Sequence, residues 1–207
     1  MRINRVIRTL VTSDFLLISG FAVFGPVFAV FITQEIEVGS LAIIGFTAAI
    51  FQITKSSLQI PIANYLDKNH GEKDDFYSLI IGSFLIALVP FLYLFASRPI
   101  HLYLVNVVYG MGAAFAIPPW NAIFTRHIDK MHESTDWAVE SVSIGIGAAS
   151  AAALGGILAE KFGFQVVFTV AGFVAIAGAI TLIKIYADLR TKVPRHQVFP
   201  KPGRKHH

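Results

Sequence analysis

The sequence predicts an all-α integral membrane protein with six transmembrane helices. Of its 207 residues, 55% are hydrophobic and 14% are charged, whereas a soluble globular domain carries about a quarter charged residues. The charges gather in short clusters between long apolar runs, and a run of about 18 apolar residues suffices to span a bilayer. Because lipid offers the backbone no hydrogen-bond partners, the spanning segments must be helical.

Six apolar segments follow one another along the chain. The connections between them are short, so sequential helices are expected to lie antiparallel. The predicted spans are residues 14–33, 41–66, 76–96, 101–124, 138–159 and 164–186. The transmembrane domain therefore covers residues 14–188, between an N-terminal cytoplasmic segment (1–13) and a basic, disordered cytoplasmic tail (189–207).

The first apolar segment is expected to be a retained helix and not a cleaved signal peptide. Three arginines precede it, as they would in a signal peptide. Its apolar stretch is longer than the roughly 7–15 residues of a signal-peptide core, and no small-x-small cleavage site follows.

The distribution of positive charge predicts that both termini are cytoplasmic. Six spans place the termini and the second and fourth loops on one side of the membrane. Of the 17 Lys and Arg residues, 14 lie on that side, Arg98 and Lys161 lie on the other, and Lys55 lies within a span. Because positive residues are retained in the cytoplasm, we expect a multi-pass protein of the plasma (inner) membrane.

Several function classes find no support in the sequence. There is no cysteine, no nucleotide-binding loop, no metal-ligand spacing and no pairing of a nucleophile with a base. We therefore expect no catalytic residue, metal or cofactor. The basic residues are expected to anchor the topology at the lipid headgroups, and no nucleic-acid partner is expected.

A loop motif lies between the second and third spans, PIANYLDKNHGEK at residues 61–73. It resembles the signature loop of the major facilitator superfamily, in which a small residue precedes an aspartate by four positions and basic residues and a glycine follow. The corresponding residues are Ala63, Asp67, Lys68, Gly71 and Lys73. Ala63 stands for the usual glycine, and the spacing from the aspartate to the glycine is one residue longer than usual.

Two other segments resemble the same family. In the first span, Gly20 and Pro26 are similar to a pattern seen among the family's antiporters. The segment that begins with Gly155 and Gly156 resembles the junction of the family's fifth and sixth helices, although it lacks the preceding glycine-proline pair of antiporters. In the fourth span, Asn106 stands where many members carry an arginine linked to proton coupling. The resemblance covers about residues 10–188 and implies one six-helix half of such a transporter.

A polar stripe in the second span marks a candidate cavity. Lys55 lies 12 residues before Asp67, which is about 18 Å from the cytoplasmic end of its helix. A lysine near mid-membrane is costly unless it is paired or hydrated. Gln52 and Gln59 share its helical face. The sequence leaves open whether Lys55 contacts substrate or belongs to a structural ion pair.

Other polar residues extend the candidate cavity. Asn106 and Tyr109 give the fourth span a second polar lining. Asp14 and Glu140, near the cytoplasmic ends of the first and fifth spans, are candidate partners for Lys55, or else interfacial residues. Glu140 is included among the cavity residues, and Asp14 is expected to lie at the headgroups.

Small residues predict where helices pack closely, because lipid supplies no hydrophobic drive for helix association. Gly147, Gly155 and Gly156 recur on the fifth span, and Gly20 and Pro26 are expected to shape the first. The favoured interpretation is a packing face. The alternative is a smooth face along which neighbouring helices slide.

The resemblance implies a secondary transporter of small solutes that works by alternating access. Members of this family have two parallel six-helix halves, so we expect a parallel homodimer or pairing with a second half. Two alternatives remain: a non-transporting membrane scaffold or accessory subunit, and a fragment of a longer transporter. The lipid bilayer and an unidentified small molecule are the expected partners.

Overall fold

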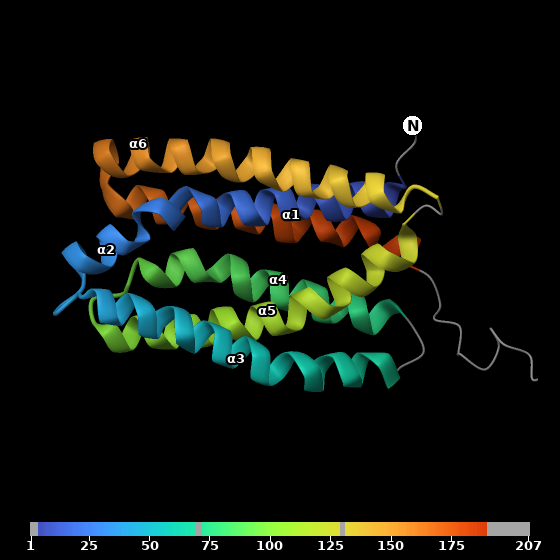
Figure 1. Cartoon of the computed structure of the whole chain (residues 1–207), viewed down its shortest axis with the longest axis horizontal. Coiled ribbons are helices and arrows are strands. Elements are labelled where there is room, and N and C mark those ends of the chain that lie inside the picture. The colour runs from blue at the N-terminus through green and yellow to red at the C-terminus, as the bar shows by residue number, and fades with distance from the viewer. Residues whose placement is uncertain (1–3, 69–71, 129–130, 190–207) are drawn as a thin grey trace, which may run out of the picture.

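The computed structural model describes residues 4–68, 72–128 and 131–189, and these residues form helices and short connections without a strand (Figure 1). The predicted disordered tail lies almost wholly outside the described residues. The elements in order are α1 (Arg5–Phe24), η1 (Gly25–Val27), α2 (Phe28–Glu35), α3 (Leu41–Lys68), α4 (Glu72–Tyr93), α5 (Pro99–His127), α6 (Glu133–Thr181) and η2 (Leu182–Asp188).

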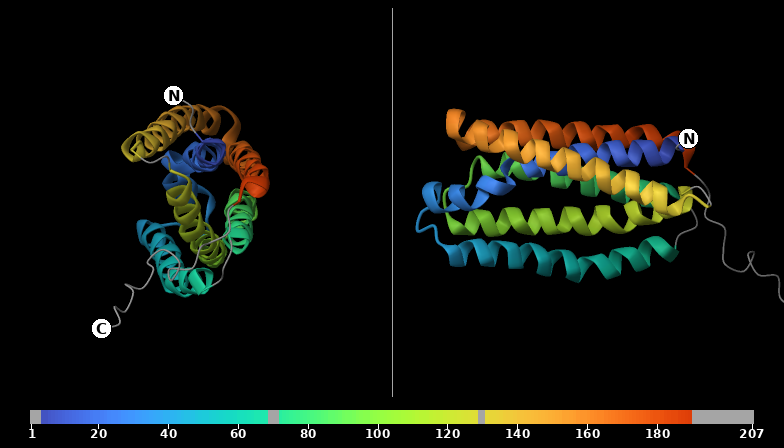
Figure 2. Two further views of the ribbon diagram at one scale, coloured as in Figure 1. Left: turned by 90° about the vertical axis from the view of Figure 1, so that its right-hand side faces the viewer. Right: turned by 45° about the horizontal axis from the view of Figure 1, so that its top comes forward.

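Among the described residues, five helical stretches are long and apolar enough to cross a membrane. The count differs from the predicted six because the spans expected at 138–159 and 164–186 both fall within one continuous stretch, Glu133–Asp188. Gly163 interrupts this stretch with φ 78° and ψ 173°, a conformation that glycine adopts without strain. At that end α6 folds back, and α1 lies between its two antiparallel arms (Figures 1 and 2).

The first predicted span is divided into three elements. Asn4 caps α1, because its side chain accepts a hydrogen bond from the backbone N–H of Val6 at 2.9 Å. Pro26 lies in η1, the 3-10 turn that separates α1 from α2. Proline has no backbone N–H to continue the helical ladder, and the break therefore occurs where the sequence has its first internal proline.

Glycines allow α1 to lie directly against both arms of α6. A Cβ on Gly20 would stand 2.8 Å from the carbonyl oxygen of Ala171 in the second arm. A Cβ on Gly155, in the first arm, would overlap the carbonyl group of Val23. In contrast, a Cβ on Gly156 would meet nothing within 4 Å. We call the contacts of Gly20, Gly147 and Gly155 the glycine seam.

The helix α3 lies at the edge of the bundle, beside α5 and away from α1 and α6 (Figures 1 and 2). Only Thr47 and Leu66 of its 28 residues are buried. It approaches α5 closely at Gly110, whose added Cβ would stand 2.8 Å from the carbonyl oxygen of Phe51. Most of the remaining surface of α3 therefore faces away from the rest of the chain.

The glycine seam yields a prediction with a control in the adjacent position. Gly155→Ala is expected to lower the free energy of unfolding by about 1–3 kcal/mol, because the new methyl group forces α1 and α6 apart. Gly156→Ala adds the same methyl group in open space and should leave stability unchanged. Thermal unfolding of the purified variants in detergent measures both, and equal midpoints would contradict the close contact at Gly155.

Candidate functional site

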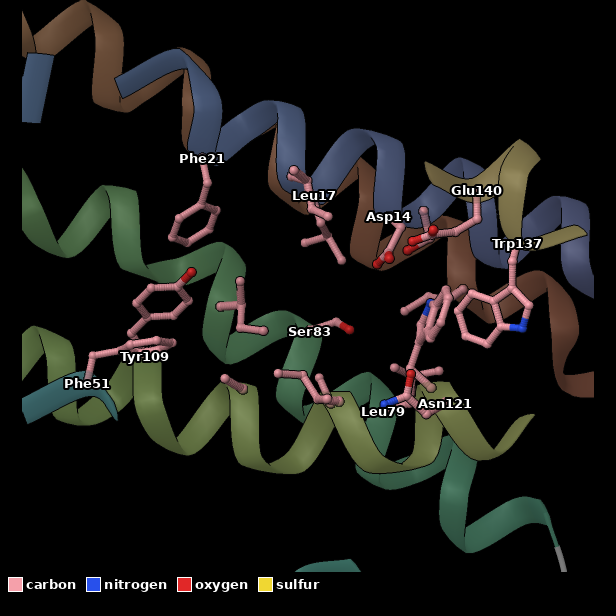
Figure 3. A pocket seen from close by; sticks show the side chains of 18 residues that line it. Asp14, Leu17, Phe21, Phe51, Leu79, Ser83, Tyr109, Asn121, Trp137 and Glu140 are labelled. Carbon is pink, nitrogen blue, oxygen red and sulfur yellow. The ribbon is translucent and has the colours of Figure 1, made fainter. Parts of the chain in front are cut away.

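A cavity of about 410 Å³ opens between the pair α1 and α6 and the pair α4 and α5 (Figure 3). Its volume lies in the range of small-molecule binding sites, about 300–1,000 Å³. Helices α1, α3, α4, α5 and α6 and the turn η2 each contribute lining residues. The walls are mostly apolar, with a few polar groups at defined positions.

Two carboxylates face each other at one end of the cavity. Asp14 comes from α1 and Glu140 from the first arm of α6, and their side chains point toward one another (Figure 3). The two groups interact electrostatically. No described residue donates a hydrogen bond or forms an ion pair with either of them, and none of the described lining residues is basic. Such charges are costly to hold in an apolar setting without a counter-charge.

Aromatic rings stand at both ends of the cavity. Beside the carboxylates, the Trp120 and Trp137 ring centroids are 6.3 Å apart. The ring of Phe124 contacts both of these rings. At the other end, Tyr109 stacks between Phe21 and Phe51, with centroid distances of 4.8 and 4.2 Å. The cavity therefore has aromatic side chains at both of its ends.

Two polar atoms in the lining have no hydrogen-bond partner among the described residues. Ser83 is 1% exposed and Trp120 is 9% exposed, and the Ser83 Oγ and Trp120 Nε1 atoms are both unpaired. Figure 3 shows the Ser83 hydroxyl directed into the space between the helices. Because buried polar groups are nearly always hydrogen-bonded, these two atoms are available to a bound molecule.

The residues that the sequence assigns to the cavity lie in different environments. Tyr109 and Glu140 line it. Lys55 is half-buried and does not line the cavity. Its Nζ atom lies 5.4 Å from the centroid of the ring of Phe51, which does. Gln52 is exposed and Gln59 is half-buried, and neither is a lining residue.

Asn106 is buried, and hydrogen bonds to neighbouring residues fix its side chain. Its Nδ2 atom donates hydrogen bonds of 2.9 Å to the hydroxyl of Tyr93 and to the carbonyl of Leu102. It ties α5 to α4 and does not reach the cavity lining.

Asp14 is the lining residue that sequence reasoning assigned to the headgroups. It lies nine residues after the start of α1 at Arg5, which is about 13 Å along the helix. One signal in the sequence marked it: Asp14 is the single charged residue between Arg8 and Glu35. An isolated charge in so long an apolar run is expected to be functional.

The residues of the signature loop lie at the ends of α3 and α4. Asp67 and Lys68 are exposed, and Ala63 is half-buried. Lys73 is exposed, with its Nζ atom 5.8 Å from the ring centroid of Tyr186. Gly71 falls outside the described residues.

Ion pairs between charged side chains join α4 to α5 at the end of the bundle where the signature loop lies. The Arg126 Nη1 atom lies 2.7 Å from the Asp75 Oδ2 atom and 3.2 Å from the Glu72 Oε1 atom. Both carboxylates are buried, and the guanidinium is partly exposed. The sequence does not reveal these ion pairs, because the proximity of Arg126 to Asp75 depends on the packing of α4 against α5.

Residues 10–205 match the sequence profile of the Major Facilitator Superfamily. The chain belongs to this superfamily. It is 24% identical, over 161 residues, to an uncharacterised MFS-type transporter of Methanocaldococcus jannaschii, a match that covers 78% of this chain and 40% of that protein. The chain is therefore similar to less than half of its relative.

The fold is similar to that of a solved transporter. PepTSo, a transporter of the POT family, superposes with a TM-score of 0.71 at 12% sequence identity. The superposition covers 94% of this chain and 40% of PepTSo. The family profile agrees with the resemblance of the loop at 61–73 and, together with the apolar helices, indicates a multi-pass membrane protein. The solved structure supports the fold.

The Arg126 ion pairs yield a second prediction. Arg126→Gln removes the guanidinium from two buried carboxylates and is expected to cost about 3–5 kcal/mol of stability. Arg98→Gln, which breaks an ion pair with Glu37 whose side chains are both 65% exposed, should cost less than about 1 kcal/mol. Thermal unfolding in detergent compares the two, and an equally small effect of both substitutions would contradict a structural role for Arg126.

Proposed function

We propose that the chain forms one six-helix half of a secondary transporter that moves small solutes through the cavity by alternating access. The observation that carries this proposal is the cavity itself: it joins polar groups from several helices in a chain of a transporter family. Its size suits a small solute, and its lining combines apolar walls with a few oriented polar groups, as binding sites do.

The proposal counts six crossings of the membrane. The last helical stretch has 56 residues, far more than the about 20 that one crossing requires, and Gly163 divides it. Six crossings and the excess of Lys and Arg on one side favour cytoplasmic termini in an inner membrane. The end of the cavity with Asp14 and Glu140 is then the cytoplasmic end.

A complete transport pathway requires a second half, and the surface of this chain supports one. The helix α3 has a largely uncovered face that carries the polar stripe of Gln52, Lys55 and Gln59. Polar groups that face lipid are costly. A parallel second copy of this chain covers that face in our proposal and supplies the opposite wall of the pathway.

Alternating access is tested by labelling from each side of the membrane, which is simple because the chain has no cysteine. Asn121→Cys places a thiol in the cavity lining, and Phe173→Cys places one on an exposed apolar surface of α6. We expect a membrane-impermeant thiol reagent to modify position 121 from both sides of oriented vesicles and position 173 from neither. Modification of position 121 from one side alone would favour a static scaffold.

The homodimer is tested by cross-linking between differently tagged copies. One copy carries Asp67→Cys and the other Thr135→Cys, so that any product that holds both tags is intermolecular. The resemblance of the loop at 61–73 to the family signature implies that Asp67 meets the start of a helix in the other half. We therefore expect a short bifunctional reagent to join the two copies in native membranes. Phe95→Cys, 80% exposed at the other end of the bundle, replaces Asp67→Cys in the control. Absence of a product from the first pair would contradict the parallel dimer.

A further inference from the structure

We propose that the solute is an amphipathic organic cation, an amine or quaternary ammonium with an apolar body, whose charged group lies between Asp14 and Glu140. This proposal deepens the proposed function and rests on it, because it assigns a substrate class to the same cavity. Cation binding can nevertheless be measured without transport, so each of the two proposals can be refuted independently of the other.

The charge of the lining selects a cation. Asp14 and Glu140 interact with each other and with no basic described residue of the lining. Two like charges at short range in a medium of low dielectric constant repel strongly. The ammonium of Lys55 lies outside the lining, over the Phe51 ring at the other end of the cavity. A cationic ligand between the carboxylates relieves both the repulsion and the cost of burial, whereas an anion increases them.

The aromatic rings beside the carboxylates favour an organic ammonium group over a small inorganic ion. Trp120 and Trp137 both line this end of the cavity, and the face of an indole is the strongest aromatic partner of a cation. Calcium needs six to eight oxygen ligands, whereas the described residues contain no group of three His, Cys, Asp or Glu side chains that could hold a metal ion.

The unpaired polar atoms are a second, independent indication of a ligand. The Ser83 Oγ atom is buried, lacks a partner among the described residues and lines the same cavity. A hydroxyl oxygen accepts a hydrogen bond from a protonated amine. The Trp120 Nε1–H group is equally unpaired and lines the same cavity.

The rest of the cavity accommodates an apolar body. Leu17, Ile86 and Ala113 are apolar lining residues, and Figure 3 shows Leu17 between the carboxylates and the rings of Tyr109 and Phe51. About 410 Å³ is available, which is far more than an ammonium group alone requires. The geometry therefore matches a ligand with a positive head and an apolar or aromatic tail.

The test uses intrinsic fluorescence, because the two tryptophans of the chain are Trp120 and Trp137 and both line the cavity. Tetraphenylphosphonium and the smaller benzyltrimethylammonium are titrated into purified protein in detergent. Tetraphenylborate, of nearly the same shape as the first probe but opposite charge, is the control. We expect a saturable change of emission with at least one cation and none with tetraphenylborate. No saturable change with either cation, or an equal response to the anion, overturns the proposal.

Substitutions locate the binding site. Asp14→Asn and Glu140→Gln are each expected to weaken cation binding about tenfold, the equivalent of one charge-assisted contact. Asp14→Glu keeps the charge and should retain affinity, and Glu37→Gln, exposed and outside the lining, should have no effect. Unchanged affinity in both neutralised variants overturns the proposal. If one neutralised variant fails to fold, the proposal is judged on the cation affinity of the other variant and on the charge selectivity of the unmodified protein.

Uptake in proteoliposomes separates the two proposals. Cation binding without uptake of the same probe contradicts transport and leaves the binding site in place. Transport of other solutes without saturable cation binding contradicts the cation site and leaves the transporter in place.

Discussion

The close approach of α1 to both arms of α6 determines the position of the groups that give this protein its chemistry. Lipid does not drive apolar helices together, so the contact depends on the van der Waals fit of the glycine seam. Ser13 adds a hydrogen bond of 2.9 Å from its Oγ atom to the carbonyl oxygen of Gly178. Asp14 follows Ser13 directly, and Glu140 lies two turns before Gly147, which packs on the Phe15 ring. The same contacts that hold the helices together therefore bring the two carboxylates face to face.

The sequence predicted the helical fold, the family and most span boundaries, because these depend on local composition. Long apolar runs require helices in lipid, and the loop at 61–73 resembles a family signature. The junction at 160–163 was expected as a loop, but the structure has one helical stretch that turns on Gly163. A single glycine with positive φ replaces a loop there, and a pattern of apolar residues contains no information on such a turn.

The candidate site was predicted in part, and the differences have a physical cause. Tyr109 and Glu140 do line the cavity, whereas Lys55 and Asn106 lie in its surroundings. Helical periodicity shows which residues share a face, but not which neighbour covers that face. For the same reason two kinds of carboxylate look alike in the sequence. Glu72 and Asp75 form ion pairs with Arg126, whereas Asp14 and Glu140 have no such counter-charge in the described lining. Only the packing of α1, α4, α5 and α6 distinguishes the two pairs.

The exposed position of α3 bears on the stability of this helix in the membrane. It is the least apolar of the five candidate spanning stretches and the least buried, and its uncovered face is the one that the proposed second copy would cover. If the proposed second copy covers this face, the cost of holding Gln52 and Lys55 in lipid falls on unpaired copies alone. Pairing would then stabilise the helix itself as well as complete the pathway.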